Sequence, residues 1–375
     1  MKIIADENIT FAQEAFSSIG EVRLLHGRKI TNEELKGADA LIVRSITNVN
    51  KELLHGTNIQ FVGTATIGTD HIDEKYFTEA GIKFASAAGC NSNAVKEYAL
   101  NAIFDLFVKN EDNLKNKSIG IIGAGNIGSK LVKIAETMGL TIVKNDPPLK
   151  RLTGDNSYSS LEEALNCDII TFHVPLNLTG IDKTVHLLND KNIGLIKSGA
   201  VLINSSRGSV VDNQALKNRL AQRKDFSVIL DVWEEEPNPD LELLELVDIG
   251  TPHIAGYSFE GKVNGTTMIY CAVCDHFNLE KKWEPKLPRT VNALIEIKNS
   301  GLENNLHNIL NHAYPIREDD KFLREIKKKN NISEYFDSLR KNYRYRRELN
   351  NYTVKAEGLD NKFKSILKEL RINVI

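Results

Sequence analysis

Three polar residues of this sequence follow apolar runs that have the pattern of strands. Arg207 comes shortly after AVLIN, Glu236 after SVILD, and His253 after VDIG. In an open parallel sheet the carboxyl ends of the strands line the ligand crevice, so these three side chains can meet there. Their types suit hydride transfer from a secondary alcohol next to a carboxylate. An imidazole takes the hydroxyl proton, a carboxylate offsets the imidazolium charge, and a guanidinium binds the substrate carboxylate.

Each of these residues also fits a role without chemistry. Arg207 is compatible with an exposed arginine at a strand end, Glu236 with a solvated acidic loop, and His253 with a hydrogen-bonded turn. Spacing along the chain does not show that the three converge, so both interpretations stay open at this point.

The segment GAGNIG follows an apolar strand-like run and opens a helix-like segment. Gly123 allows a tight turn, Gly125 lets a pyrophosphate approach the backbone, and Gly128 permits close packing of the helix on the strand. Asn126 and Ile127 complete the turn, and the helix start offers free amides to phosphates. We therefore predict a dinucleotide site here. The alternative is a glycine turn that binds no nucleotide.

Asp146 ends the next predicted strand, 18 residues after Gly128. A carboxylate at this position accepts hydrogen bonds from the adenosine ribose and repels a 2′-phosphate, which favours NAD over NADP. Lys144 and Arg151 lie nearby, so the preference for NAD need not be strict.

The elements that must position these residues alternate between strand-like and helix-like segments over the first 255 residues, a pattern typical of α/β layers. A helix is expected at 93–110, where apolar residues form one stripe, and another at 126–138. The amino-acid composition changes at Pro285 and Pro288, after which the segments are rich in Asn and Lys. The expected strands are 2–5, 40–44, 60–64, 82–85, 118–122, 141–145, 168–173, 200–204, 227–231 and 352–355.

Composition narrows the class of protein. The chain has 375 residues, which suggests two or three domains, and 41% of them are hydrophobic while 26% are charged. These values argue against disorder, collagen and a disulfide-stapled scaffold. No apolar run reaches the length of a membrane span, and MKIIADE does not have the pattern of a signal peptide. With only four scattered cysteines, the chain is expected in the cytoplasm with no membrane partner.

The C-terminal part is basic, although the whole chain has a net charge of −2. Residues 281–375 hold 21 Lys and Arg against 13 Asp and Glu, and the interleaving of arginine and tyrosine in YRYRR, at Tyr343–Arg347, resembles a nucleic-acid strip. Because acids are mixed in throughout, we instead expect a basic surface on a C-terminal domain and no nucleic-acid partner.

Two groups of residues resemble metal sites but are better explained by packing. Cys271 and Cys274 form a CxxC pair in a helix-like segment without a second ligand pair, and His71 lies beside Asp70 and Asp73 at a predicted turn. A structural zinc site needs four ligands. We therefore expect no metal site.

The motifs, taken together, occur in an order that resembles the D-isomer-specific 2-hydroxyacid dehydrogenases. The resemblance implies that His253 is the acid/base, Glu236 its partner, and Arg207 the residue that orients and polarises the substrate. It also implies NAD as cofactor, with contacts from the glycine turn, Asp146, Val174, Ser205, Ser206, Arg207, Asp231 and Gly256. The motifs are Gly123-x-Gly125-x-x-Gly128, Asp146, His173-Val-Pro-Leu, Asn204-x-x-Arg207-Gly, Asp231-Val-Trp-x-x-Glu236-Pro and Pro252-His253-Ile-Ala-Gly.

Further segments resemble a branch of this family that acts on 4-phospho-D-erythronate. This resemblance implies NAD-dependent oxidation to 2-oxo-3-hydroxy-4-phosphobutanoate, a step of pyridoxal 5′-phosphate (vitamin B6) synthesis. Ser45, Thr66 and Tyr257 would contact the substrate and Arg44 would offset its phosphate charge, whereas turn chemistry is the alternative for the two hydroxyls. The segments are DEN at 6–8, VRSIT at 43–47, FVGTATIGTDH at 61–71, AGCN at 88–91, HIAGY at 253–257 and FDSLRKNY at 336–343.

The predicted fold is α/β, with two doubly wound parallel-sheet lobes and a smaller C-terminal α/β domain. A flavodoxin-like lobe, residues 1–95 with 256–284, is expected to bind the substrate, a phosphorylated 2-hydroxy acid. A Rossmann lobe, residues 96–255, is expected to bind NAD. The resemblance implies that residues 285–375 form a dimerisation domain of a homodimer.

Two other functions share these features. Another D-2-hydroxyacid dehydrogenase, such as one for 3-phosphoglycerate, would keep the same three chemical residues. A non-catalytic NAD(H)-sensing scaffold of the corepressor type can keep them too. The C-terminal match favours the phosphorylated four-carbon acid over both.

Overall fold

The computed structural model describes residues 1–297, 300–355 and 358–375, and the chain divides into two compact units. The first unit comprises Met1–Asn91 and Ser258–Arg289, and the second comprises Ser92–Tyr257 and Thr290–Ile375. The C-terminal part therefore packs with the central part of the chain. The three functional domains predicted from the sequence stay a prediction, because compactness does not test what each part binds.

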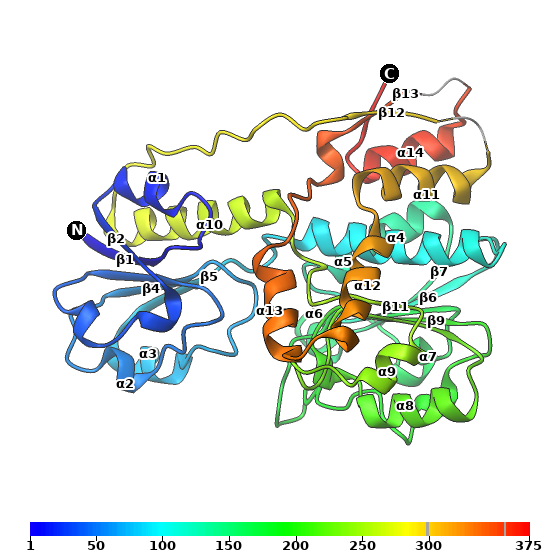
Figure 1. The fold of residues 1–375 in the computed structure, drawn as a ribbon, viewed down its shortest axis with the longest axis horizontal. Helices are drawn as coiled ribbons and strands as arrows, with labels where there is room; N and C mark the ends of the chain where they lie inside the picture. The colour runs from blue at the N-terminus through cyan, green and yellow to red at the C-terminus, as the bar shows by residue number, and fades with distance from the viewer. Residues whose placement is uncertain (298–299, 356–357) are drawn as a thin grey trace. The chain divides into compact units, whose positions relative to one another are not determined.

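The first unit is built on a five-stranded parallel sheet with helices on both faces (Figure 1). Ile3 and Ala5 of the first strand face a core shared with Tyr270, whereas Ile4 faces a second core that contains Phe77. This alternation is what a strand buried on both faces requires. The strands, in sheet order, are β2 (Glu21–Leu25), β1 (Lys2–Asp6), β3 (Ala40–Val43), β4 (Phe61–Thr64) and β5 (Lys83–Ser86), and the helices are α1 (Ala12–Ser17), α2 (Lys51–Leu54), α3 (Glu74–Ala80) and α10 (Phe259–Phe277).

The second unit contains a six-stranded parallel sheet. The chain passes from β6 to β7 on one side and then returns to β8 on the other side of β6, so the strand order reverses at β6. In open α/β sheets ligands bind at this switch point, beyond the carboxyl ends of the strands. The strands, in sheet order, are β11 (Ile249–Gly250), β10 (Ser227–Leu230), β9 (Val201–Asn204), β8 (Ile169–Phe172), β6 (Ser118–Ile122) and β7 (Thr141–Asn145).

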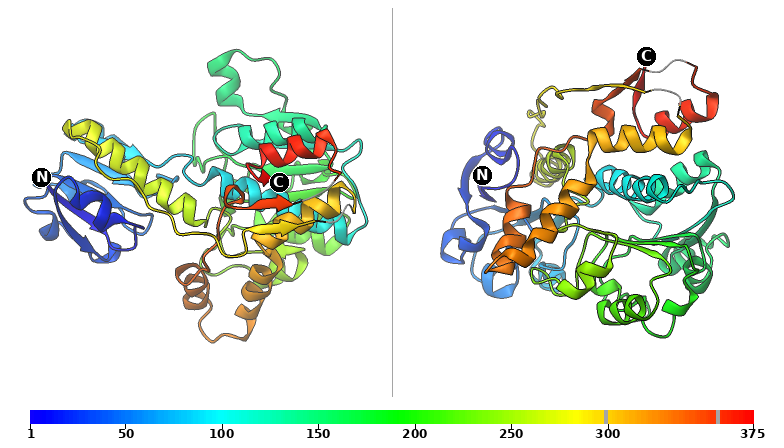
Figure 2. Two further views of the ribbon diagram at one scale, coloured as in Figure 1. Left: turned by 90° about the horizontal axis from the view of Figure 1, so that it is seen from above. Right: turned by 45° about the vertical axis from the view of Figure 1, so that its right-hand side comes forward.

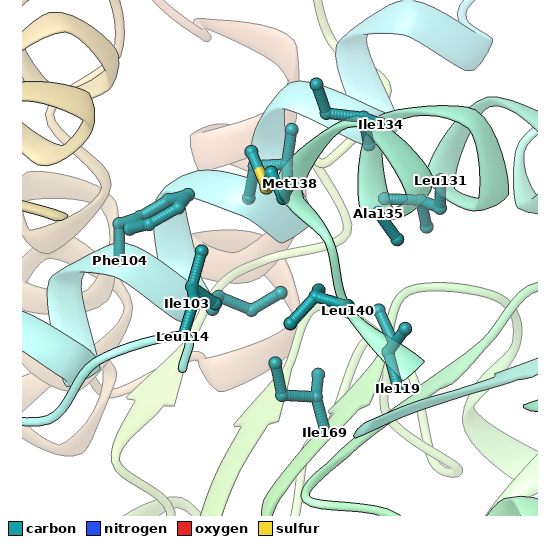
Figure 3. Close-up of a pocket in the computed structure, with 11 residues that line it drawn as sticks. Ile103, Phe104, Leu114, Ile119, Leu131, Ile134, Ala135, Met138, Leu140 and Ile169 are labelled. Carbon is teal, nitrogen blue, oxygen red and sulfur yellow. The ribbon is translucent and has the colours of Figure 1, made fainter. Parts of the chain in front are cut away.

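Helices cover both faces of this sheet. A small, wholly apolar pocket lies among side chains of α4, α5, β6 and β8, including Ile103, Met138 and Ile169 (Figure 3). With no polar lining it belongs to the packing of the core and offers no chemistry. The helices are α4 (Ser92–Lys109), α5 (Gly128–Met138), α6 (Pro147–Thr153), α7 (Leu161–Leu165), α8 (Asn213–Gln222) and α9 (Leu241–Leu246).

The C-terminal part adds a three-stranded parallel sheet and four helices to the second unit. Figures 1 and 2 show α11 running along α4, and α14 packs on α5. The sequence predicted only the middle strand of this sheet, at 352–355, and not the strands on either side of it. The elements are β12 (Leu294–Glu296), β13 (Thr353–Lys355), β14 (Asn373–Val374), α11 (Leu302–Ala313), α12 (Ile316–Arg324), α13 (Ile332–Lys341) and α14 (Asn361–Glu369).

The fold class predicted from the sequence is confirmed by these parallel sheets. The predicted strands and the two helices coincide with observed elements to within two residues at each end. Strand β2 was not predicted, because EVRLL is polar at alternate positions and none of its residues is buried. In the described parts of the chain, no helix is long and apolar enough to cross a membrane.

One aromatic residue anchors α13 to the second unit. Phe336 is fully buried in the core that also contains Trp233 and Leu244, and Leu323 of α12 joins the same core. A helix with polar exposed faces is held mainly by such apolar contacts.

We expect Phe336→Ala to lower the free energy of unfolding by about 3–5 kcal/mol, because a large buried ring would be replaced by a cavity. Urea unfolding followed by circular dichroism measures this change. Phe322→Ala is the matched control, since Phe322 on α12 is 49% exposed. Equal effects of the two substitutions would show that α13 is not anchored through Phe336.

Candidate active site

A histidine and a glutamate form a hydrogen-bonded pair beyond the strand ends of the second unit. His253 Nδ1 lies 2.7 Å from Glu236 Oε2, and Glu236 Oε1 accepts the amide of Trp233 at 2.9 Å. Burial alone would raise the pKa of Glu236, but the charge and hydrogen bond of His253, the Trp233 amide and the charge of Arg340 hold this pKa below its usual value. The carboxylate is thus ionised at neutral pH and engages Nδ1, which leaves Nε2 for proton exchange.

The loop that carries His253 is held by a buried carboxylate. Asp231 follows β10, is 1% exposed, and accepts the amides of Ile254 and Ala255 at 2.8 and 2.9 Å. It also accepts the hydroxyl of Thr251 at 2.6 Å, and its carbonyl accepts the amide of His253 at 2.7 Å. These bonds hold His253 at a φ of +58°, in the left-handed region. The predicted contact of Asp231 with NAD stays a prediction, because these bonds already account for its burial.

An arginine from the C-terminal part holds the same loop from another side. Arg346 is 3% exposed and donates Nη1 to the carbonyl of Ala255 at 3.2 Å. Its Nη2 donates to the carbonyl of Ala94 in α4 at 2.7 Å, and the guanidinium lies 3.9 Å from the ring centroid of Tyr314. Arg346 therefore connects the His253 loop to the start of α4.

Two arginines of the YRYRR segment do not contribute to the expected basic surface. Like Arg346, Arg347 is buried, with 5% of its surface exposed, and it donates to Asn351 Oδ1 at 2.7 Å. Arg344 is partly exposed; it pairs with Glu318 and lies 3.3 Å from Asp319. The segment that resembled a nucleic-acid strip therefore turns Arg346 and Arg347 inward, while Tyr345 is 58% exposed.

Arg207 stands in a turn built by Asn204, the last residue of β9. Asn204 Oδ1 accepts the amide of Ser206 at 3.1 Å and its hydroxyl at 2.8 Å, while Nδ2 donates to the carbonyl of Arg207 at 2.9 Å. Arg207 Nη1 donates to the carbonyl of Ser206 at 2.8 Å. A Cβ on Gly208 would lie 2.0 Å from the backbone of Trp233, so glycine lets this turn pack against the segment after β10.

The glycine turn lies at the switch point of the sheet, between β6 and α5. Gly123 has a φ of +90°, and a Cβ on Gly128 would lie 2.0 Å from the carbonyl of Gly123. A Cβ on Gly125 would meet nothing within 4 Å, and Gly125 and Asn126 are exposed. In the described structure no side chain caps α5 at Ile127. An accessible backbone beside uncapped helix amides fits the pyrophosphate of a dinucleotide.

Asp146 joins the end of β7 to this turn. Its Oδ2 accepts the amide of Ala124 at 2.8 Å, and its Oδ1 accepts the amide of Leu149 at 3.0 Å as the N-cap of α6. An ionised carboxylate has about four acceptor positions, so these bonds leave room for ribose hydroxyls. The residue is half-buried at the place where the sequence expects the ribose.

The other predicted cofactor residues lie at neighbouring strand ends. Val174 follows β8, and its Cγ1 would lie 2.9 Å from a Cβ on Gly123, so it packs over the glycine turn. Ser205 follows β9 and is 9% exposed, and Gly256 follows the His253 loop. Their contacts with NAD stay predictions.

Three predicted substrate residues belong to the first unit, at the ends of the adjacent strands β3 and β4. Arg44 Nε lies 3.3 Å from Oδ2 of Asp6, whose side chain is fully buried. Ser45 is exposed. The hydroxyl of Thr66 lies 2.7 Å from that of Thr64 and donates to a backbone carbonyl at 3.3 Å. Local bonding of Thr66 is thus observed, and its substrate contact stays a prediction.

The fourth predicted substrate residue, Tyr257, is in the second unit and contacts the C-terminal part. Its ring packs edge-on against Tyr343, with 5.7 Å between centroids, and the guanidinium carbon of Arg340 lies 5.8 Å from its centroid. Arg340 was not predicted as a site residue. Its charge beside Tyr257 and Glu236 is a property that only the folded chain reveals.

Comparison with known proteins accounts for this arrangement. Residues 91–255 match the family model described as D-isomer specific 2-hydroxyacid dehydrogenase, NAD binding domain. Residues 287–370 match a second model, described as a domain of unknown function. Erythronate-4-phosphate dehydrogenase of Proteus mirabilis (strain HI4320) is 43% identical over 361 residues, which cover 96% of this chain and 96% of the relative. The chain belongs to the erythronate-4-phosphate dehydrogenase family.

Solved structures extend the comparison. D-lactate dehydrogenase from Aquifex aeolicus, complexed with NAD and lactic acid, matches with a TM-score of 0.57 and 26% identity over 74% of this chain and 96% of that one. NAD+-bound 3-phosphoglycerate dehydrogenase of Entamoeba histolytica matches with a TM-score of 0.63 and 24% identity over 76% of this chain and 99% of that one, which shows a shared fold. The predicted family and the NAD-binding domain are confirmed.

One group of side chains in this family member has the composition of a metal site. His186 Nε2 is hydrogen-bonded to Glu234, and His186 Nδ1 lies 3.6 Å from Asp212. Asp212 caps α8 by accepting the amide of Ala215 at 2.9 Å, and Glu234 accepts the amide of Asn213 at 3.1 Å. Helix capping explains the group, and the expectation of no metal stays a prediction.

A second histidine of the erythronate-4-phosphate dehydrogenase motifs lies after β8. His173 Nε2 is 2.8 Å from the hydroxyl of Thr171, and its Nδ1 is buried, although the residue as a whole is partly exposed. Burial lowers the pKa of His173 to about 3. The imidazole is therefore neutral in the folded protein at physiological pH.

We expect His173 to make the fold less stable as the pH falls from about 6.5 towards 3. In this range the unfolded histidine takes up a proton that the folded one does not, so protonation favours the unfolded state. Urea unfolding at a series of pH values measures the slope, and His173→Asn should flatten it. His312→Asn, at an exposed residue of α11, is the control and should leave the slope unchanged. A slope that His173→Asn leaves unchanged would contradict the assignment.

Proposed function

We propose that this chain oxidises 4-phospho-D-erythronate to 2-oxo-3-hydroxy-4-phosphobutanoate with NAD, as a step of pyridoxal 5′-phosphate synthesis. The observation that carries the reaction type is the His253–Glu236 hydrogen bond of 2.7 Å in a chain with an NAD-binding domain. The substrate is supported by 43% identity to an erythronate-4-phosphate dehydrogenase along nearly the whole chain.

The oxidation removes a hydride from C2 and a proton from the C2 hydroxyl. NAD, when bound, supplies the hydride acceptor. His253 takes the hydroxyl proton at Nε2, since Nδ1 is held by Glu236. Glu236, ionised and anchored by the Trp233 amide, stabilises the imidazolium that results. The neutral imidazole is restored when this proton passes to water.

Arg207 is the proposed partner of the substrate carboxylate. A guanidinium binds a carboxylate with two parallel hydrogen bonds and polarises the carbonyl that forms beside it. The Asn204 turn fixes the backbone of Arg207 and so fixes the origin of its side chain. Ser45, Thr66, Tyr257 and Arg44 are the other proposed substrate contacts.

The test is NADH formation by the purified chain with NAD and 4-phospho-D-erythronate, in the presence of a carbonyl trap. Parallel reactions contain 3-phosphoglycerate and D-lactate. We expect a clear preference for the four-carbon phosphate. Activity on only one of the other two acids would support the proposed reaction type but contradict the assigned substrate. No activity on any of the three acids, with NAD binding confirmed, would favour the non-catalytic scaffold.

His253→Ala should lower kcat at least about 100-fold, because general acid/base catalysis typically contributes that factor. His312→Ala is the matched control, because His312 is an exposed histidine with no role in the proposed mechanism. Wild-type turnover in His253→Ala would remove the proposed proton acceptor.

Asp146→Ser should weaken the binding of NAD and should raise kcat/KM with NADP relative to kcat/KM with NAD by about tenfold or more. The substitution removes a charge-assisted hydrogen bond to the ribose, and it also removes the repulsion of a 2′-phosphate. The ratio of kcat/KM for the two cofactors measures the effect. An unchanged ratio would contradict the contact.

Two finer parts of the proposal are a homodimer and a cytoplasmic location. The homodimer is supported by the resemblance on which the sequence analysis drew, and the cytoplasmic location by the four scattered cysteines.

A further inference from the structure

A cation from the C-terminal part lies beside the proposed catalytic pair. Arg340 is in the last turn of α13, with its guanidinium carbon 5.8 Å from the ring centroid of Tyr257. Tyr257 comes four residues after His253. Arg340 is also close enough to Glu236 for its charge to act on that carboxylate. In the proposed mechanism this charge only helps to keep Glu236 ionised, and it is assigned no contact with the substrate.

The place of Arg340 is set by the core. Phe336 is fully buried, and Leu339 packs against the same cluster of apolar side chains. Residues four apart on a helix lie on one face, so the burial of Phe336 turns Arg340 towards the body of the unit. The guanidinium therefore starts from a rigid element, as a binding group must.

The guanidinium has capacity for a further acceptor. In the part of the chain that the structure describes, Arg340 Nε is buried without a hydrogen-bond partner. Arg346 and Arg371 share this feature of Nε, but their terminal nitrogens donate to carbonyls and to Glu348 respectively. Arg340 contacts Tyr257 through the ring and through a side-chain hydrogen bond, and the charges of Glu236 and Asp337 act on it, but none of these contacts engages Nε. A buried donor of this kind calls for an anionic acceptor.

We propose that Arg340 binds the phosphate group of the substrate and thereby selects phosphorylated over unphosphorylated 2-hydroxy acids. This inference rests on the proposed function. Arg207 is assigned to the carboxylate, and a second anionic group needs a second cation. Arg44, the other candidate, is already paired with the buried Asp6.

The segment that carries Arg340 has a family description of its own. Arg340 lies in residues 287–370, which match a separate family model. The cation thus comes from a segment with its own family description, outside the NAD-binding domain.

The test compares Arg340→Gln and Arg340→Lys with the full-length wild type on 4-phospho-D-erythronate and on D-erythronate. Arg340→Gln should lower kcat/KM for the phosphorylated acid at least tenfold more than it lowers kcat/KM for D-erythronate. Arg340→Lys should recover part of the loss. Arg344→Gln is the matched control, because Arg344 pairs with Glu318 in the same part of the chain. It should leave the ratio between the two acids unchanged.

Equal losses on both acids would overturn the inference. With a shifted pH profile, they would indicate that Arg340 positions the Glu236–His253 pair. If Arg340→Gln loses the circular dichroism signal of the folded protein, Arg340→Lys decides the outcome. Arg340 has a structural role if Arg340→Lys also fails to fold, whereas the inference is supported if Arg340→Lys folds and keeps the preference for the phosphorylated acid.

A binding measurement separates this inference from the proposed function. Inorganic phosphate is titrated into the NADH-loaded wild type and Arg340→Gln by calorimetry. The Kd should rise at least tenfold in the variant. Equal Kd values, or no phosphate binding by the wild type, would overturn the assignment of Arg340. If the wild type turns over neither acid but phosphate binding depends on Arg340, the result contradicts the proposed function. It still supports an anion site at Arg340.

Discussion

The buried carboxylate of Asp231 is the interaction on which the geometry of the candidate site depends. Its oxygens take the amides of Ile254 and Ala255 and the hydroxyl of Thr251, and its carbonyl takes the amide of His253. A carboxylate removed from water must be satisfied in this way, and burial raises the pKa of Asp231 despite these bonds. The loop is thus folded around one acid at the end of β10. Glu236 follows on the same strand exit, so one strand end places both members of the pair.

A cation from a remote part of the chain completes this arrangement. Arg346 donates to the carbonyl of Ala255, whose amide is bonded to Asp231. One peptide group of the loop is therefore held by an anion on its donor side and by a cation on its acceptor side. Burying a guanidinium is costly unless its donors are used, and two carbonyls and the Tyr314 ring meet this need for the terminal nitrogens of Arg346. Moving the loop away would leave a buried charge without these partners.

The sequence predicts the framework because its signals are local. Apolar runs of four or five residues mark the central strands, and GAGNIG marks the turn after β6. Arg207, Glu236 and His253 are found because each follows a predicted strand and lies in a motif of the family that the sequence resembles. The structure brings Glu236 and His253 together, and no pattern along the chain contains that distance.

The parts that the sequence could not predict depend on partners that carry no signal of their own. Arg346 is bonded to backbone carbonyls, which every residue has, so its burial could not be distinguished from exposure on a basic surface. The pattern Asn204-x-x-Arg207 allows the side-chain amide of Asn204 to hydrogen-bond within its own turn. Only the structure shows that it does so, because the same pattern fits an exposed asparagine. Strand β2 was missed for a related reason: it is a short edge strand with no buried residue, so its sequence lacks the apolar run that marks the central strands.

The bond between Arg346 and Ala255 also has a meaning for biosynthesis. The two residues are 91 positions apart, and the arginine comes later. Protein chains emerge from the ribosome N-terminus first, at about 5–20 residues per second. The strands of the NAD-binding sheet, the glycine turn and the His253 loop are therefore all synthesised before the side chain that holds the loop exists. A nascent chain can complete its NAD-binding sheet while its chemical centre is still unfinished, and the protein gains that centre only after Arg346 has been translated.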